Sequence, residues 1–219
     1  MKLLLTSGGI TNTSIGDALA DMLGKPIADS SALCIPTALW GYPRREAVLA
    51  QEFLSGRAWG GMTSLKWKSL GVLELATLPT VGAEHWVPWV RETDVLLAAG
   101  GETTYLCHWM RESGLADLLP SLADTLWVGV SAGSLVMTPR IGDAFVEWPA
   151  AQDDRTLGVV DFSIFPHLGV FPENSLAEAQ RWVATIGGPC YAIDDQTALK
   201  VVDGKVEVIS EGQWKRFAD

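Results

Sequence analysis

Short, almost purely apolar runs alternate along the chain with longer stretches in which apolar and polar residues mix. Several apolar runs end at glycine or proline, as the run 94–99 does before Gly100-Gly101. Short apolar runs bounded by turn residues are typical of buried β-strands. We therefore predict strands over 3–7, 31–35, 71–76, 94–99, 126–130, 161–165, 191–193, 197–202 and 205–209.

The longer mixed stretches have the spacing of amphipathic helices. They predict helices over 13–23, 44–56, 103–114, 173–186 and from 132 onward. Continuous apolar strands that alternate with helices indicate a mostly parallel sheet covered on both faces. We expect an α/β fold with a doubly wound sheet flanked by helices, a C-terminal β-hairpin turning at Asp203-Gly204, and one domain over 1–219.

Composition excludes several kinds of partner. The formal net charge of −10 disfavours nucleic acid and anionic membranes, which bind basic surfaces. The apolar run that follows Met1 is too short for a signal peptide and no apolar run is long enough to span a bilayer, so we expect neither a leader nor a membrane span. Its 3 cysteines are widely spaced and predict neither a disulfide framework nor a metal site. We expect a cytoplasmic monomer or homodimer that needs no cofactor.

A candidate nucleophile lies at the end of the strand 126–130. Gly129-Val130-Ser131-Ala132-Gly133 is a Gly-x-Ser-x-Gly motif between a strand and a helix. In such a turn the strained serine projects from the sheet, and the glycines let strand and helix approach closely. The motif predicts a nucleophilic Ser131; the alternative is a packing turn with an inert serine.

A serine hydroxyl needs a base to take its proton. Of the 3 histidines, His167 alone follows a predicted strand, whereas His85 and His108 lie in or beside helices. An acid should orient that base, and Asp194 and Asp195 both follow the strand 191–193. Successive side chains of an extended chain face opposite ways, so one of the two is expected to reach His167.

Developing negative charge on the substrate calls for backbone N–H donors. Ala132 directly follows the nucleophile, and Gly101 ends the strand 94–99, so their N–H groups are candidates for an oxyanion hole. Gly100 is beside them and is a candidate for substrate contact. The alternative for the glycine pair is a plain turn that starts the next helix.

Four segments together resemble peptidase E (aspartyl dipeptidase) and its relative cyanophycinase, which share the fold of class I glutamine amidotransferases. The segments, which keep the order found in that family, are 99–103, 129–134, 165–167 and 193–199. The resemblance implies a Ser-His-acid triad in which Asp195 stands where the family usually has glutamate. It also implies that Gly101 and Ala132 supply the oxyanion donors.

Departures from the family pattern bear on specificity. Glu102 stands where the family usually has asparagine, and Glu178 is nearest to the arginine that reads the acidic side chain in aspartyl dipeptidases. The family also has a basic segment after the nucleophile helix, and Arg140 is the only basic residue here that lies near the matching position. We therefore take Glu102 and Arg140 as candidates for substrate binding and do not expect strict specificity for Asp-X substrates. Arg140, Arg155 or Arg181 could instead bind a carboxyl terminus, which would suit carboxypeptidase-like trimming.

These features predict a serine dipeptidase or exopeptidase that acts on short peptides through an acyl-enzyme. Glutamine hydrolysis of the amidotransferase kind is disfavoured, because it needs a cysteine where Ser131 stands. A catalytically inactive binding or regulatory protein on the same scaffold is the alternative of a different class.

Overall fold

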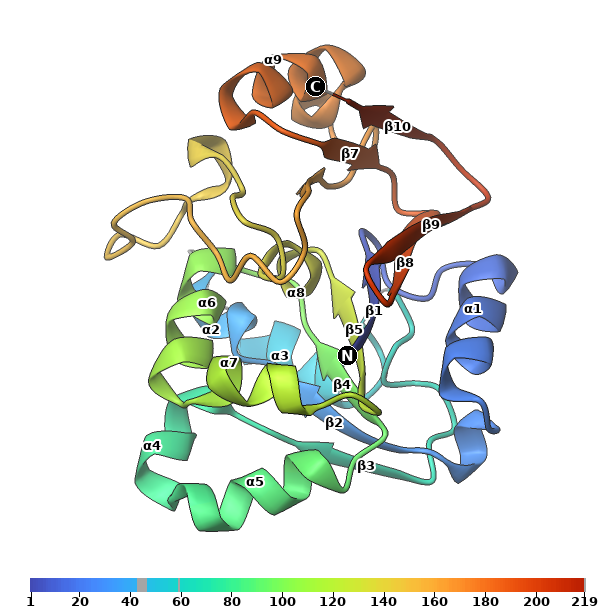
Figure 1. Cartoon of the computed structure of the whole chain (residues 1–219), viewed down its shortest axis with the longest axis vertical. Helices are drawn as coiled ribbons and strands as arrows, with labels where there is room; N and C mark the ends of the chain where they lie inside the picture. Colours follow the sequence, from blue (N-terminus) through green and yellow to red (C-terminus); the bar gives the residue numbers. More distant parts are fainter. Residues whose placement is uncertain (43–46, 59, 219) are drawn as a thin grey trace.

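A central sheet runs through the computed structural model, which describes residues 1–42, 47–58 and 60–218. Within these residues the sheet has seven strands in the order β3-β2-β4-β5-β1-β8-β9 (Figure 1). The strands are β1 (Lys2–Thr6), β2 (Ser31–Ile35), β3 (Ser69–Val72), β4 (Val95–Ala98), β5 (Leu126–Val130), β8 (Thr197–Val202) and β9 (Lys205–Ser210). β1 to β5 pair in parallel, and β8 and β9 add an antiparallel hairpin at one edge.

Both faces of this sheet are covered, as the strand pattern predicts. Leu3 and Leu5 of β1 belong to one buried cluster, and Leu4 between them belongs to another. The first cluster holds α5 (Ala83–Arg91) and α6 (Thr103–Glu112), and the second holds α1 (Thr13–Leu23). The alternation follows from the two-residue period of a strand and confirms the predicted mixed α/β fold.

The remaining helical segments are short, apart from α9 near the C-terminus. They are α2 (Ala38–Gly41), α3 (Ala47–Leu54), α4 (Leu78–Val81), α7 (Leu115–Leu118), α8 (Ala132–Leu135) and α9 (Leu176–Ile186), with 3₁₀ turns η1 (Ile27–Asp29), η2 (Leu75–Thr77), η3 (Leu119–Ser121), η4 (Asp143–Phe145) and η5 (Pro172–Asn174). Among the described helices, none has the length and apolar content needed to cross a membrane.

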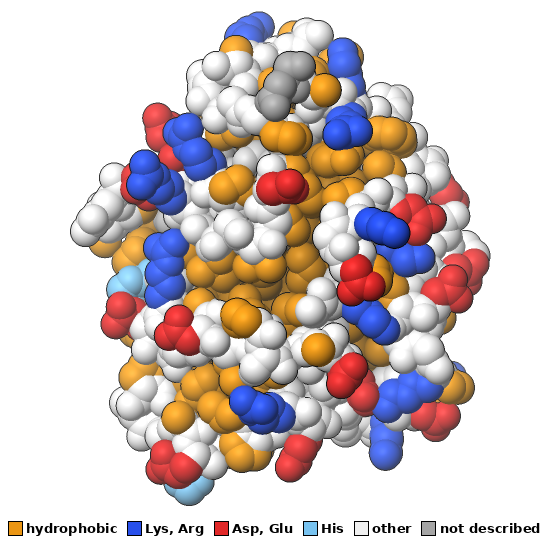
Figure 2. Space-filling model, viewed as in Figure 1, with side chains coloured by type: hydrophobic (Ala, Val, Ile, Leu, Met, Phe, Trp, Pro, Cys, Tyr) orange, Lys and Arg blue, Asp and Glu red, His pale blue; other side chains and the backbone are white. Residues whose placement is uncertain are grey.

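A second, smaller sheet lies beyond the C-terminal ends of the central strands (Figure 1). It contains β6 (Ser163–Phe165), β7 (Cys190–Ile193) and β10 (Trp214–Phe217) in the order β10-β7-β6. α9 packs on it through Ala179 and Trp182. The sequence pattern detects β6 and β7 but does not say which sheet they join, and it misses β10. Figure 2 shows hydrophobic side chains gathered across the middle of one face of the molecule, between this upper part and the central sheet.

Four predicted elements differ from the structure, and one of them, the helix expected over 173–186, begins only at Leu176 after η5. The helix from 132 is only the single turn α8, because the Thr138 hydroxyl donates to the Leu135 carbonyl at 2.7 Å and Pro139 offers no N–H. The strand expected over 71–76 ends at Val72, and 75–77 form η2. The helix expected over 44–56 is α3, although 44–46 lie outside the described residues.

Candidate active site

Ser131 occupies a strained turn between β5 and α8. Its backbone angles are φ 49° and ψ −114°, a conformation that side-chain-bearing residues rarely adopt. The glycines on either side are required by close contacts: a Cβ on Gly129 would lie 2.3 Å from the Gly133 oxygen, and one on Gly133 would lie 2.3 Å from the Ala98 oxygen. The predicted strand–turn–helix geometry is therefore present.

His167 and Asp195 lie in line with this serine. Nε2 of His167 is 3.0 Å from Oγ of Ser131, and Nδ1 is 2.7 Å from Oδ1 of Asp195. An ionised carboxylate can only accept, so Nδ1 carries the ring hydrogen and Nε2 is left to accept the Ser131 proton. The Asp195 side chain is buried and the imidazole is partly exposed, so the base faces a solvent-accessible space while its partner is shielded.

The three residues come from different parts of the fold. Ser131 ends a central strand, His167 follows β6 of the smaller sheet, and Asp195 lies in the connection from β7 to β8 that joins the two sheets. The site is thus assembled between the sheets. The sequence pattern predicts the strands before Ser131, His167 and Asp195 but does not show that they belong to two sheets.

Asp194 faces a different environment from its neighbour. Its carboxylate accepts hydrogen bonds from the Thr197 hydroxyl at 2.7 Å and from the Gln213 backbone N–H at 2.5 Å. These bonds close the turn before β8 and attach it to the segment before β10. Asp195 is the residue of the pair that contacts His167.

His85 and His108 lie elsewhere. His85 is mostly exposed and beside Glu84 on α5. His108 packs against the rings of Trp109 and Trp148. Neither ring lines the cavity that contains Ser131.

The glycine pair after β4 lies against the nucleophile turn. A Cβ on Gly100 would be 3.4 Å from the Cβ of Ser131, and one on Gly101, at φ 128°, would lie 2.4 Å from the Ala38 oxygen. Ala132 is the first residue of α8, where a helical N–H has no intrahelical acceptor. Gly100, Gly101 and Ser131 all line one cavity.

Sequence reasoning missed Ser7, the residue that follows β1. Its side chain is buried, and its hydroxyl contacts both His167 and Asp195. Thr11 was missed as well: its hydroxyl donates to the Asp195 carbonyl at 2.6 Å. Ser7 could have been found from its position at the carboxyl end of a predicted central strand, where binding sites of α/β sheets lie. Ser131 occupies the same kind of position.

Glu102 is buried and serves the fold. Its carboxylate caps α6 by accepting from the Thr104 hydroxyl and the Tyr105 N–H, and it also accepts from the N–H groups of Glu147 and Trp148 at 3.1 and 3.2 Å. These bonds tie the loop after η4 to the start of α6. The residue lines the cavity, but its oxygens are engaged by the protein.

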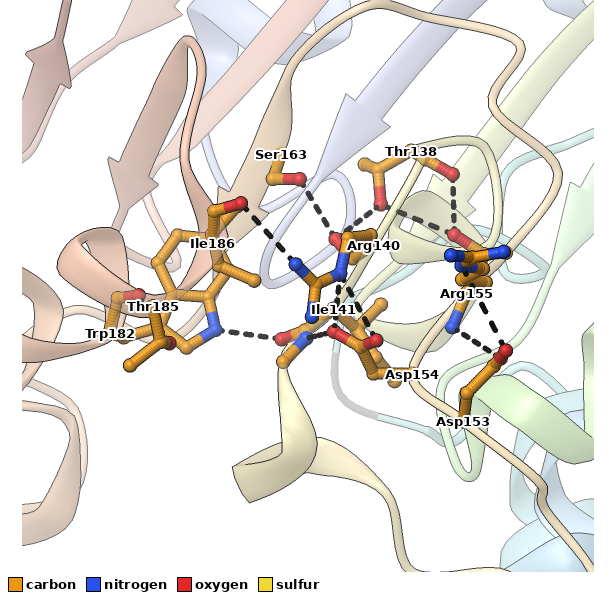
Figure 3. Close-up of polar contacts among 12 residues, drawn as sticks. Thr138, Arg140, Ile141, Asp153, Asp154, Arg155, Ser163, Trp182, Thr185 and Ile186 are labelled. Carbon is orange, nitrogen blue, oxygen red and sulfur yellow. Dashed lines mark hydrogen bonds and ion pairs between the residues drawn. The ribbon is translucent and has the colours of Figure 1, made fainter. Parts of the chain in front are cut away.

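Arg140 lies in a polar cluster that does not line the cavity around Ser131 (Figure 3). Its Nε donates to both carboxylate oxygens of Asp154 at 3.1 and 3.0 Å, and Oδ2 of that buried aspartate also accepts the Gly142 N–H at 2.9 Å. The Trp182 ring N–H donates to the Ile141 carbonyl in the same cluster. Arg140 therefore anchors the segment that leads to η4.

The other arginines weighed for substrate binding are also paired. Arg155 is exposed beside Asp153. Arg181 pairs with Glu178 on α9, and both line a smaller hollow of about 390 Å³. This hollow adjoins the cavity that contains Ser131, because Ala144, Phe145 and Glu173 line both.

A cavity of about 610 Å³ opens above Ser131 and His167. Apolar and aromatic side chains form much of its wall, namely Leu39, Tyr42, Leu49, Leu135, Ala144, Phe145, Pro166 and Phe171. Apart from Glu102 and Asp195, its carboxylates are Glu147 and Glu173, and both of these residues are exposed. No lysine or arginine is among the described residues that line it.

Possible metal ligands and two of the buried cysteines were compared with the requirements of metal and thiol sites. No group of three or more His, Cys, Asp or Glu side chains in 1–42, 47–58 and 60–218 is arranged to hold a metal ion. Burial raises the pKa of the Cys34 thiol to about 12 and that of Cys107 to about 11. Both thiols are thus protonated at neutral pH and are poor nucleophiles.

Solved structures with this fold are described as peptidases. The chain superposes on a peptidase E candidate from Listeria monocytogenes EGD-e with a TM-score of 0.70 and 20% identity, covering 96% of this chain and 98% of that one. It superposes on a peptidase from an acI-B1 Actinobacterium with a TM-score of 0.62 and 17% identity, covering 99% and 93%. At these identities the likeness shows the fold alone.

The sequence narrows this class to one family. The model of peptidase family S51 matches residues 3–209, and the chain belongs to that family. It is 27% identical over 127 residues to the uncharacterized peptidase PM1590 of Pasteurella multocida, covering 54% of this chain and 60% of that one. It is also 27% identical over 155 residues to the uncharacterized peptidase Lin0382 of Listeria innocua, covering 67% and 73%. The resemblance to peptidase E stated from four short segments is confirmed.

Proposed function

We propose that this protein is a serine peptidase that hydrolyses short peptides through Ser131, His167 and Asp195. The observation that carries the proposal is the continuous contact from Oγ through the imidazole to the carboxylate, at 3.0 and 2.7 Å. These distances are those of direct proton transfer and of an orienting hydrogen bond.

In the proposed reaction, Oγ of Ser131 attacks the scissile carbonyl while Nε2 of His167 takes its proton. The carbon–nitrogen bond of the tetrahedral intermediate then breaks, and the imidazolium gives this proton to the leaving amine. Water hydrolyses the acyl-enzyme with His167 again acting as base. The Asp195 carboxylate stabilises the imidazolium that forms in each half-reaction.

The N–H groups of Gly101 and Ala132 are the proposed oxyanion donors. Gly101 needs the room that only glycine leaves beside α2, and Ala132 begins α8 directly after the nucleophile. Donors of this kind are worth about 3–4 kcal/mol each in transition-state stabilisation.

The cavity supports short substrates and argues against strict Asp-X specificity. Its volume of about 610 Å³ suits a ligand of a few residues. Exposed Glu147 and Glu173 would repel a substrate carboxylate, and Arg140, which could have neutralised one, is bound to Asp154. The same carboxylates favour a free amino terminus, so we propose dipeptidase or aminopeptidase-like cleavage in a reducing cytoplasm.

The first test uses Ser131→Ala and His167→Ala, with His108→Ala as the matched control. We expect the first two variants to lose peptide turnover by at least about 10³-fold. Ser131→Ala should also lose labelling by a fluorophosphonate, while His108→Ala keeps both properties. Turnover by Ser131→Ala would contradict the role of Ser131 as nucleophile. A wild-type protein that neither labels nor hydrolyses peptides would contradict the peptidase proposal and favour an inactive binding protein.

The second test is a panel of dipeptides and tripeptides blocked at either end. We expect an amino-terminal acetyl group to abolish cleavage and a carboxyl-terminal amide to be tolerated. The reverse result would favour carboxypeptidase-like trimming, with Arg181 of the adjoining hollow as the carboxylate-binding residue. A strong preference for amino-terminal aspartate over neutral residues would refute our account of the cavity charge.

A further inference from the structure

A buried hydroxyl, that of Ser7, contacts both the base and the acid of the proposed triad. Ser7 directly follows β1, the strand that pairs with β5 and so runs beside the nucleophile strand. Its side chain is 1% exposed. It does not line the cavity, so it cannot touch a substrate held there.

We propose that Ser7 is a positioning residue that fixes His167 and Asp195 with one hydroxyl group. The inference rests on the proposed function and names the part of the chain that keeps its base and acid aligned.

The hydroxyl has one hydrogen, and its position follows from the acceptor beside it. Oγ of Ser7 is 2.7 Å from Oδ1 of Asp195, so the hydrogen is donated to the carboxylate. That same Oδ1 accepts the Nδ1 hydrogen of His167 at 2.7 Å. Two donors thus converge on one oxygen and hold the carboxylate in the rotamer that faces the imidazole.

The oxygen of the same hydroxyl also accepts a hydrogen bond from the backbone of His167. The His167 backbone N–H donates to Oγ of Ser7 at 2.7 Å. His167 has φ 56°, in the left-handed region that residues with a Cβ avoid. The N–H···Oγ bond therefore holds His167 in an unfavourable conformation that directs its ring towards Ser131. Nδ1 is farther from Oγ of Ser7, at 3.3 Å, than from Asp195.

Removal of the hydroxyl should loosen both partners without changing the substrate cavity. Small displacements of a catalytic group cost rate far more than they cost binding, and about 1 Å can cost on the order of 100-fold. We expect Ser7→Ala to lower kcat about 10- to 100-fold and to leave KM nearly unchanged. Ser7→Thr, which keeps the hydroxyl, should recover most of the loss.

The matched control is Ser30→Ala, because Ser30 is also fully buried after a turn and donates only to the Pro26 carbonyl at 3.0 Å. The readout besides kcat is the low-field proton signal of the His167 Nδ1–H in full-length protein. We expect this signal to move in Ser7→Ala and to stay in place in Ser30→Ala.

Several results would overturn the proposal. Ser7→Ala could keep the wild-type kcat, could lose activity with an unmoved Nδ1–H signal, or could behave like Ser30→Ala. The signal also separates this inference from the proposed function. If wild-type protein neither labels at Ser131 nor cleaves peptides, the peptidase assignment fails, while a moved signal in Ser7→Ala still supports the bonds made by Ser7.

Discussion

The two adjacent aspartates provide a sharp prediction, because they differ in what they contact rather than in chemistry. Asp195→Asn keeps the shape of the side chain but removes the charge that faces His167 Nδ1 at 2.7 Å. An amide placed there either presents its N–H groups to the ring or accepts without stabilising the imidazolium. We expect kcat to fall about 10³- to 10⁴-fold, equivalent to roughly 4–5.5 kcal/mol of lost transition-state stabilisation.

Asp194→Asn is the matched control. Its carboxylate accepts from the Thr197 hydroxyl and from the Gln213 N–H, and an amide nitrogen cannot accept from either donor. We expect unfolding free energy to fall by about 1–3 kcal/mol, with kcat within about threefold of wild type. The assay is steady-state hydrolysis of the best dipeptide of the panel, alongside urea unfolding of each variant. Wild-type kcat in Asp195→Asn, or a larger kcat loss in Asp194→Asn, would refute this reasoning.

Three further predictions concern parts of the fold around the site. Gly101→Ala places a Cβ 2.4 Å from a backbone oxygen of α2. We expect denaturant unfolding to show a loss of about 2–4 kcal/mol in unfolding free energy, and we expect kcat to fall. Unchanged values of both would contradict this prediction, because they would show that the turn can relax. Asp154→Asn weakens the ion pair with Arg140 that anchors the segment leading to η4. We expect the free energy of unfolding to fall by about 1–3 kcal/mol and KM to rise. An unchanged melting temperature and an unchanged KM would contradict this prediction. Burial raises the pKa of the Cys34 thiol to about 12 and that of Cys107 to about 11, so both thiols stay protonated at pH 8. We expect iodoacetamide to leave peptidase activity intact and a fluorophosphonate to abolish it. Mass spectrometry should find Cys34 and Cys107 unmodified by iodoacetamide until denaturant is added.

Elements with strong local signals were predicted to the residue. The helix over 13–23 is bounded by Asn12, whose side chain accepts the Ile15 N–H, and by Gly24 in the left-handed conformation. The hairpin after β8 turns at Asp203-Gly204, both with positive φ. In each case neighbouring residues make the deciding contacts, so the pattern in the sequence contains the information.

Elements that depend on distant partners were not predicted. The first three residues of β10 are all exposed, so the strand has no alternating apolar pattern, and it forms by pairing with β7. The expected role of Glu102 in substrate contact did not anticipate that its carboxylate would be bound by the N–H groups of Glu147 and Trp148. A local pattern cannot show which remote donors will meet a side chain.

The sequence by itself determined the α/β class, the strained turn at Ser131 and the choice of His167, because each follows from local periodicity or from elimination among 3 histidines. Only the tertiary structure decided that His167 approaches from a second sheet, that Asp195 rather than Asp194 contacts it, and that Ser7 bonds to both. These contacts join residues that are 28 to 188 positions apart. Their geometry depends on how the two sheets pack, and packing is a property of the whole chain.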